Sequence, residues 1–543
     1  MKNFLIAIVT LLLFSCNSKE KADLLVYNAT IYTVDSSFST AEAMVVKDGK
    51  IIATGASADM EKTYDAKEKI NAQGKFIYPG FIDAHAHFAG YSMSLQTVNL
   101  VGTNSWDEAI EKVKEFAAEN PEGWITGRGW DQNDWDIKVF PSNEKLNELF
   151  PDRPVLLRRV DGHAAIANKA ALDMAGIKPG DNLTGGEIEE MEGTLTGILI
   201  DNAIGLVGAK IPSSSDEQFK KAILTAQDNC FAMGLTTIDD CGLGYKTVEG
   251  IKKLQEAGDL KMRLYVMLSD DKENYDYASK TGMIKTDRLN VRSFKVYGDG
   301  ALGSRGACLL EPYSDKTGHY GFLLSNPSHF DSVANWIYDK GWQMCTHAIG
   351  DSGNRTMLNI YAKYLKGKND RRWRIEHAQI VSRYDFNLFG ANSIIPSVQP
   401  THATSDMYWA GDRVGSVRVT GAYAYKQLLN ENGWLPLGTD FPVEDISTFK
   451  TFYAAVVRKD AKGWPESGYQ MENALSREET LRGMTIWAAK SNFEENEKGS
   501  LEKGKFADFV ILDEDLMKVA PEKILSVKVL NTFLGGEKVY EKK

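Results

Sequence analysis

Histidine and cysteine are scarce in this chain. Its 543 residues include 8 histidines and 5 cysteines. No two cysteines have CxxC spacing, which argues against a zinc knuckle, and a chain of this length needs no disulfide staples to fold. Against so few histidines, any that recur at metal-binding spacing stand out. The four cysteines beyond the N-terminal region are expected to be buried thiols, with a Cys230–Cys241 bridge as the alternative: Cys230, Cys241, Cys308 and Cys345.

An excess of positive charge is also absent. Lys and Arg total 63 against 74 Asp and Glu, which gives a formal net charge of -11. Such a surface repels phosphate backbones, so we predict no nucleic-acid partner. With 43% hydrophobic residues the chain can bury a large core, which excludes wholesale disorder.

The N-terminus lacks an apolar run that is long enough to span a membrane. The apolar stretch 4–14 follows a lysine and ends in Leu-Phe-Ser-Cys, which resembles a bacterial lipobox. We predict a lipoprotein signal peptide over 1–16, lipidation at Cys16 and a polar tether over 17–22, with a plain cleaved signal as the alternative. The protein would be exported and anchored to a bacterial envelope membrane, at the periplasm or the cell surface, and would touch lipid only through the anchor.

Apolar strand-like runs alternate with helical patterns through most of the chain. Eight such runs predict a (β/α)8 TIM barrel over 79–497, an α/β fold. The gap after the first barrel strand is too long for one helix, so an α+β insertion is expected at about 100–200. Strand-and-turn patterns over 23–78 and 498–543 predict a small composite β-sandwich built from both chain ends.

Polar side chains that suit a metal ion follow several of these runs. His85 and His87 are two residues apart after the first barrel strand, so both imidazoles can face one side. His347, His377 and Asp440 each end a later apolar run, at the face where barrel enzymes carry catalytic groups. Lys295 lies within the fourth run, where a lysine is costly unless it is paired or neutralised.

These motifs, with FIDAHAHF, VDGHAAIANKAAL, KVYGDGALGSR, THAIGD, RIEHAQ, QPTHATSD and GSLEKGKFADFVILD, are similar to the metal-dependent amidohydrolase superfamily. Within it they resemble the YtcJ-like group, which includes N-substituted formamide deformylase. The resemblance implies one or two divalent metal ions, for which imidazole and carboxylate ligands favour zinc. It further implies that His85, His87 and Asp440 hold one ion, that His347 and His377 hold the other, and that Lys295 bridges them when carboxylated.

Other residues receive supporting roles. His402, after the seventh run, is a candidate catalytic donor to the oxyanion, with Asp406 as its orienting partner. His163 and Trp130 in the insertion, with Arg305 after the fourth run, are predicted to bind substrate. A packed or surface role is the alternative for each of them.

The function predicted from this set is hydrolysis of a carbon–nitrogen bond in a small non-peptide amide. Metal-activated hydroxide would attack the carbonyl, and Asp440 would act as the catalytic acid and base. An esterase or lactonase that uses the same site is one alternative, and a lipid-anchored solute-binding protein is another. Assembly as a homodimer is left open.

Overall fold

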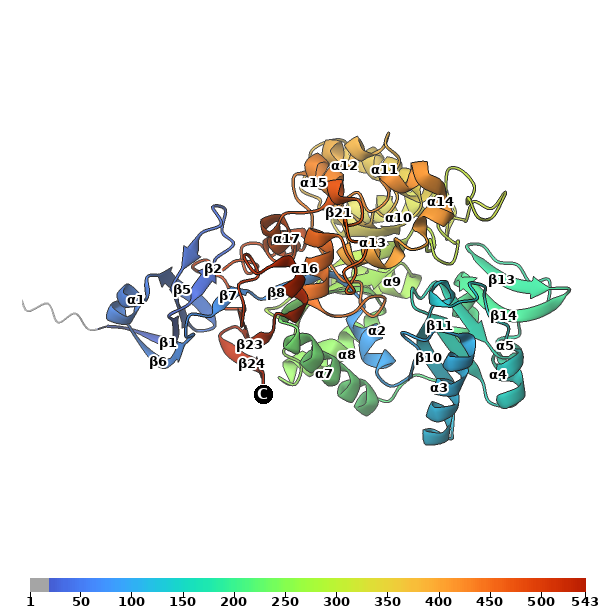
Figure 1. The fold of residues 1–543 in the computed structure, drawn as a ribbon, viewed down its shortest axis with the longest axis horizontal. Coiled ribbons are helices and arrows are strands. Elements are labelled where there is room, and N and C mark those ends of the chain that lie inside the picture. The colour runs from blue at the N-terminus through green and yellow to red at the C-terminus, as the bar shows by residue number, and fades with distance from the viewer. Residues whose placement is uncertain (1–18) are drawn as a thin grey trace, which may run out of the picture.

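A parallel β-barrel forms the centre of the molecule. The computed structural model describes residues 19–543, and Figure 1 shows the barrel surrounded by helices. The buried strands pair in the order β21-β20-β19-β18-β16-β15-β8. The predicted barrel is confirmed, with these strands: β8 (Phe81–Ala86), β15 (Leu235–Leu243), β16 (Arg263–Ser269), β18 (Leu289–Tyr297), β19 (Gln343–Ala348), β20 (Arg374–His377) and β21 (Ile395–Ser397).

The eighth predicted strand is an irregular segment instead. It still closes the barrel, because the Ala84 amide donates to the Leu437 carbonyl at 3.1 Å and the Gly438 amide donates to the Val398 carbonyl at 3.1 Å. A Cβ atom on Gly438 would lie 2.5 Å from the backbone nitrogen of His85. Glycine therefore lets this segment come close enough to β8 to complete the wall.

Helices cover the outside of the barrel and bury its apolar strand residues in one large core. The short strand β17 (Ile284–Lys285) pairs with β18 at the edge of the barrel sheet. The covering helices are α2 (Phe88–Ser94), α7 (Asp216–Ala232), α8 (Tyr245–Glu256), α9 (Lys272–Thr281), α10 (Pro327–Lys340), α11 (Asp351–Leu365), α12 (Phe386–Asn392), α13 (Pro400–Asp406), α14 (Ala410–Arg418), α15 (Tyr425–Asn432), α16 (Thr448–Val457), α17 (Arg477–Gly483) and α18 (Ile486–Ser491).

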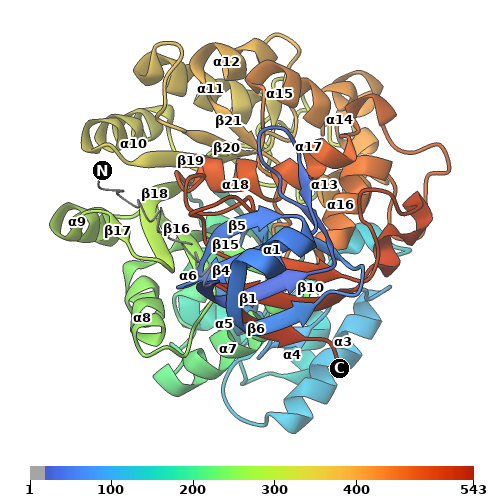
Figure 2. The same cartoon turned by 90° about the vertical axis from the view of Figure 1, so that its left-hand side faces the viewer.

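Two small sheets combine the chain ends, as predicted. One has the order β5-β4-β1-β6, and the other, β24-β23-β22-β7-β2-β3, joins strands from both termini, and these strands lie side by side in Figure 2. Glu20 already pairs with Tyr64, so residues 20–22 of the predicted tether belong to this sheet. With helix α1 (Ser57–Thr63), the strands are β1 (Glu20–Tyr27), β2 (Thr30–Tyr32), β3 (Thr40–Ala41), β4 (Ala43–Lys47), β5 (Lys50–Gly55), β6 (Tyr64–Asn71), β7 (Phe76–Pro79), β22 (Phe509–Leu512), β23 (Val529–Leu534) and β24 (Glu537–Glu541).

The predicted insertion is a separate layer of sheet and helices after β8. Figure 1 shows it on the side of the barrel away from the two small sheets. Its sheet has the order β13-β14-β12-β11-β10-β9. The insertion ends with helix α6 at Gly208, slightly beyond the predicted boundary at about residue 200. Its elements are β9 (Val98–Asn99), α3 (Trp106–Glu119), β10 (Ile125–Trp130), α4 (Glu144–Leu149), β11 (Val155–Arg159), β12 (Ala164–Ala167), α5 (Lys169–Ala175), β13 (Gly186–Met191), β14 (Thr194–Asp201) and α6 (Asn202–Gly208).

The predicted signal peptide and Cys16 lie outside the described residues. Among residues 19–543, no helix has both the length and the apolar content needed to cross a bilayer. Cys230, Cys241 and Cys345 are buried thiols as expected, and the alternative Cys230–Cys241 bridge is not formed. Cys308 is partly exposed.

One arginine lies buried inside the barrel and is surrounded by acceptors. The guanidinium of Arg374 donates to Asp239 at 2.8 Å and to Glu376 at 2.7 Å. It also donates to the Ala84 carbonyl on β8 and to Ser397 on β21. Arg374 thus joins strands from both sides of the closing segment, in a region without solvent.

Replacing Arg374 with Met is expected to lower the free energy of unfolding by about 3–5 kcal/mol, because Asp239 and Glu376 would remain buried without a counter-charge. Urea unfolding followed by circular dichroism measures this loss. Lys363→Met is the control, because the Lys363 side chain is exposed and pairs with Asp331 at the outer surface. Its loss should be much smaller, and equal losses in the two variants would contradict the interpretation.

Candidate metal centre

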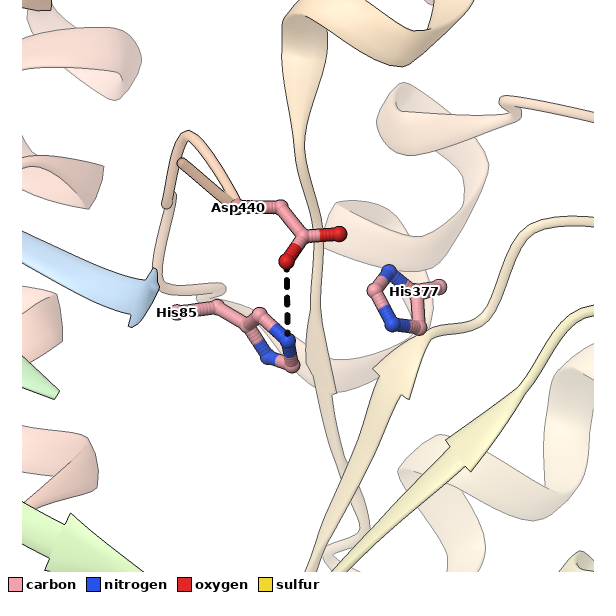
Figure 3. A group of neighbouring side chains, drawn as sticks. All are labelled: His85, His377 and Asp440. Carbon is pink, nitrogen blue, oxygen red and sulfur yellow. Dashed lines mark ion pairs between the residues drawn. The ribbon is translucent and has the colours of Figure 1, made fainter. Parts of the chain in front are cut away.

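The six predicted metal ligands meet at the end of the barrel that faces the insertion. The ligand atoms of His85, His377 and Asp440 lie within 4.8 Å of one another (Figure 3). Nε2 of His87 is 3.2 Å from Asp440 Oδ1. The ring of His347 is centred 4.6 Å from that of His377. The structure therefore brings together residues that lie up to 355 positions apart in the sequence, from His85 to Asp440.

Backbone geometry directs two of these side chains across the barrel end. His377 has φ 71° and Asp440 has φ 65°, both in the left-handed region that non-glycine residues seldom occupy. The Asp440 amide donates to the His85 carbonyl at 2.7 Å, and this bond holds the turn in place. Such conformations persist where the surroundings stabilise them, and they are frequent at functional sites.

Three imidazoles are held through Nδ1. His85 Nδ1 donates to Glu376 at 2.5 Å, His87 Nδ1 donates to the Cys241 carbonyl at 3.0 Å, and His377 Nδ1 donates to the Gln399 side-chain oxygen at 2.7 Å. With the proton on Nδ1, each Nε2 presents a lone pair to the centre. Nε2 of His347 is buried and has no hydrogen-bond partner among the described residues.

The charge states of these groups also fit a cation. Burial, with Lys295 nearby, lowers the pKa of His85 to about 4. Burial and neighbouring positive groups lower the pKa values of His347 and His377 well below the ordinary value. Burial opposes ionisation of Asp440, but the contacts with His402 and His87 prevail and hold its pKa well below the ordinary value. Neutral imidazoles around an ionised carboxylate are the protonation states that bind a divalent ion.

Lys295 points into the same cluster from β18. Its side chain is buried, and Nζ lies 3.1 Å from Nε2 of His85. No carboxylate oxygen among residues 19–543 lies within 4.0 Å of Nζ. The amine is therefore placed beside the imidazole ligands without an ion-pair partner.

His402 lies between two carboxylates. Nε2 is 3.2 Å from Asp440 Oδ2, and Nδ1 is 3.0 Å from Glu444 Oε1. Burial opposes protonation, but these two bonds raise the pKa of His402 well above the ordinary value. The prediction that Asp406 orients His402 was wrong. Asp406 accepts hydrogen bonds from Tyr423 and Gln379, and Glu444 holds His402 instead.

A cavity of about 1200 Å³ opens over the cluster, between the barrel and the insertion. His163 reaches it from the loop between β11 and β12 and lines its wall, so the predicted contact with substrate stays a prediction. Its Nδ1 bonds to Asp201 at 2.5 Å, and its ring is centred 4.8 Å from that of His347. The insertion therefore brings a polar side chain directly over a candidate ligand.

Two predicted substrate contacts are wrong. Trp130 is fully buried in the insertion core, where its indole nitrogen donates to the Leu157 carbonyl at 2.9 Å. The strand register shifts between Arg128 and Trp130, at Gly129 with φ 112°, and the shift turns the indole away from the cavity. Arg305 pairs with Asp315 at 2.8 Å and does not line the cavity.

Sequence reasoning missed several residues that shape the site. Glu444 lies in a loop that has no hydrophobic periodicity, so no pattern indicated its role, whereas Gln399 follows the apolar run of β21 and could have been found from that position. Asp83 is another: it accepts from the Thr439 amide at 2.9 Å and ties β8 to the loop that carries Asp440. For Glu444 and Asp83, only the position relative to the metal ligands in the structure reveals the supporting role.

Comparison with known proteins agrees with this geometry. The model of the amidohydrolase family matches residues 68–540. Protein LONG AFTER FAR-RED 3 of Arabidopsis thaliana is 34% identical, with 96% of this chain and 92% of that protein covered. The putative amidohydrolase YtcJ of Bacillus subtilis is 29% identical, with 94% and 98% covered.

Two further matches extend the comparison. N-substituted formamide deformylase of Arthrobacter pascens is 26% identical, with 96% of this chain and 98% of that enzyme covered. The crystal structure of an uncharacterized metal-dependent hydrolase from Pyrococcus furiosus superposes with a TM-score of 0.73 at 29% identity, covering 91% of this chain and all of that one. The predicted resemblance to the YtcJ-like group is confirmed.

Proposed function

This chain belongs to the amidohydrolase family and is a metal-dependent hydrolase that acts on carbon–nitrogen bonds, and on that premise we propose that its substrate is a small non-peptide amide. One observation carries the proposal. Asp440 Oδ1 faces the imidazole cluster, while Oδ2 contacts His402 at the floor of the cavity. A single carboxylate thus reaches both the metal ligands and a protonated donor.

The ligand set fits one or two divalent cations. His85, His377 and Asp440 are close enough together to hold one ion, and His87 and His347, which lie beside them, would complete the ligands. Zinc suits these donors, and when bound it would supply Lewis-acid activation of water and of the amide carbonyl.

The chain's own groups would do the rest of the chemistry. Oδ2 of Asp440 takes a proton from the attacking water and delivers it to the leaving nitrogen, which departs poorly as an anion. Protonated His402, held by Glu444 through Nδ1, turns its Nε2 hydrogen bond from Asp440 to the carbonyl oxygen as negative charge develops there. His163 contacts the substrate from the opposite wall.

Zinc-loaded protein is expected to hydrolyse members of a panel of N-formyl amines, N-acyl amines, N-acyl amino acids and cyclic amides. Asp440→Asn should lower kcat by about 100- to 10,000-fold, because it removes the group that moves the proton. Asp445→Asn is the matched control, since Asp445 lies at the cavity rim and pairs with Lys450. Turnover of matched esters alone, or normal turnover by a zinc-containing Asp440→Asn variant, would refute the proposal.

We also propose that Lys295 is carboxylated and bridges two metal ions. Its burial beside His85 without a carboxylate partner supports this, because a carbamate would turn a costly cation into a ligand. A carbamate signal is expected in 13C NMR after bicarbonate labelling, together with about two zinc ions per chain. Lys295→Ala should lower both. An unlabelled lysine and unchanged zinc content in the variant would rule out the bridge.

The lipobox-like segment supports a further proposal, that the protein is exported and anchored through Cys16. The wild-type chain is expected in the detergent phase of a phase-partition assay, because an acylated cysteine adds a large apolar group. Cys16→Ser should move it to the aqueous phase, whereas Cys308→Ser should not. Equal partitioning of the wild type and Cys16→Ser would argue against the anchor.

A further inference from the structure

Two arginines lie side by side on the insertion wall of the cavity. Arg128 lies near the C-terminal end of β10 and Arg158 near that of β11, and these parallel strands pair with Arg128 opposite Arg158. Residues paired in this way point to the same face of a sheet. Thr126 and Leu156 precede them on that face, and all four line the cavity. The face of the insertion sheet that looks toward the metal centre thus carries two adjacent guanidinium groups.

Neither guanidinium forms an ion pair with the described part of the chain. Within residues 19–543, no carboxylate oxygen lies within 4.0 Å of Arg128 or Arg158. Arg128 donates to the Val160 carbonyl at 2.7 Å, but its Nε is buried without a partner. By contrast, Arg159, which follows Arg158 in the sequence, forms ion pairs with both Asp131 and Asp161.

Most acidic groups around the cavity are already engaged and cannot serve the two arginines. Five carboxylates of the wall each contact a basic side chain. These pairs are Asp131 and Asp161 with Arg159, Asp201 with His163, Glu444 with His402, and Asp445 with Lys450.

This arrangement is costly in the free protein. Burial lowers the pKa of Arg128 to about 10, with Asp440 acting in the opposite direction. Burial also lowers the pKa of Arg158, and no neighbouring charge compensates. A partly desolvated positive charge is unfavourable unless an anion accompanies it, and adjacent guanidinium groups also repel each other. A ligand that brings a negative charge would relieve both effects.

We propose that Arg128 and Arg158 form a subsite for a carboxylate group of the substrate, so that the enzyme acts on small amides that carry a carboxylate, such as N-acyl amino acids. The inference rests on the proposed amide hydrolysis and specifies its substrate class. Guanidinium groups bind carboxylates through paired, charge-assisted hydrogen bonds. Leu156 and Ile211 line the cavity on the same wall, so an apolar side chain of the substrate would find apolar contacts beside the charge.

The test compares two substrates that differ only in the carboxylate, racemic N-acetylphenylalanine and N-acetylphenethylamine, with zinc-loaded full-length protein. We expect a higher kcat/KM for the charged substrate. Arg158→Met and Arg128→Met should each lower that value by about 10- to 100-fold, mainly through KM, because each removes a charge-assisted contact. The neutral substrate should change by less than about twofold. Arg383→Met removes an exposed arginine away from the cavity and should change neither.

A binding measurement separates the subsite from the reaction. Calorimetry compares 3-phenylpropanoate with 3-phenylpropanol, neither of which contains an amide. Tighter binding of the carboxylate that is lost in Arg158→Met supports the subsite, even if neither amide is hydrolysed and the proposed reaction fails for this pair. Carboxylate binding that persists in both arginine variants, or equal kcat/KM for the two amides in all proteins, overturns the subsite and leaves the proposed hydrolysis standing.

Discussion

The buried charge of Arg374 is the constraint on which the barrel interior depends. Its guanidinium is shared by Asp239, Glu376, Ser397 and the Ala84 carbonyl, which come from strands on both sides of the closing segment. Arg374 also lowers the pKa of Glu376, so this carboxylate stays ionised against the cost of burial. Glu376 in turn accepts a hydrogen bond from Nδ1 of His85. A structural ion pair and a candidate metal ligand are thus parts of one network.

The same principle of indirect support applies around the rest of the centre. Gln399 fixes His377, and Asp83 fixes the loop that presents Asp440. Each supporting group lies at or next to a barrel strand end, so rigid elements set the orientation of the ligands and loops supply only short connections. The insertion then adds groups of a different kind, polar and charged side chains directed at whatever occupies the cavity.

The fold and the ligand set were predictable because they depend on patterns that topology makes reliable. Residues that follow apolar barrel strands meet at one end of the barrel, so His85, His347 and His377 could be placed together without coordinates. Trp130 could not be placed, because a register shift of one residue at Gly129 reverses the face on which it lies. The partner of His402 could not be predicted for a related reason. Glu444 lies in a loop without periodicity, so the sequence does not show that its carboxylate, and not that of Asp406, comes within hydrogen-bond distance of His402.

The joining of both termini in one sheet has a consequence for biogenesis. The hydroxyl of Tyr78 on β7 bonds to the carboxylate of Asp515, 437 positions further along the chain, and β7 pairs directly with β22. During synthesis β7 must therefore wait for almost the entire chain before it can pair with β22, although its other neighbour, β2, is available at once. Contacts of such long range are slow to establish. A nascent chain would keep one edge of β7 unpaired over most of translation, and a late truncation would leave that edge, near the beginning of the protein, exposed.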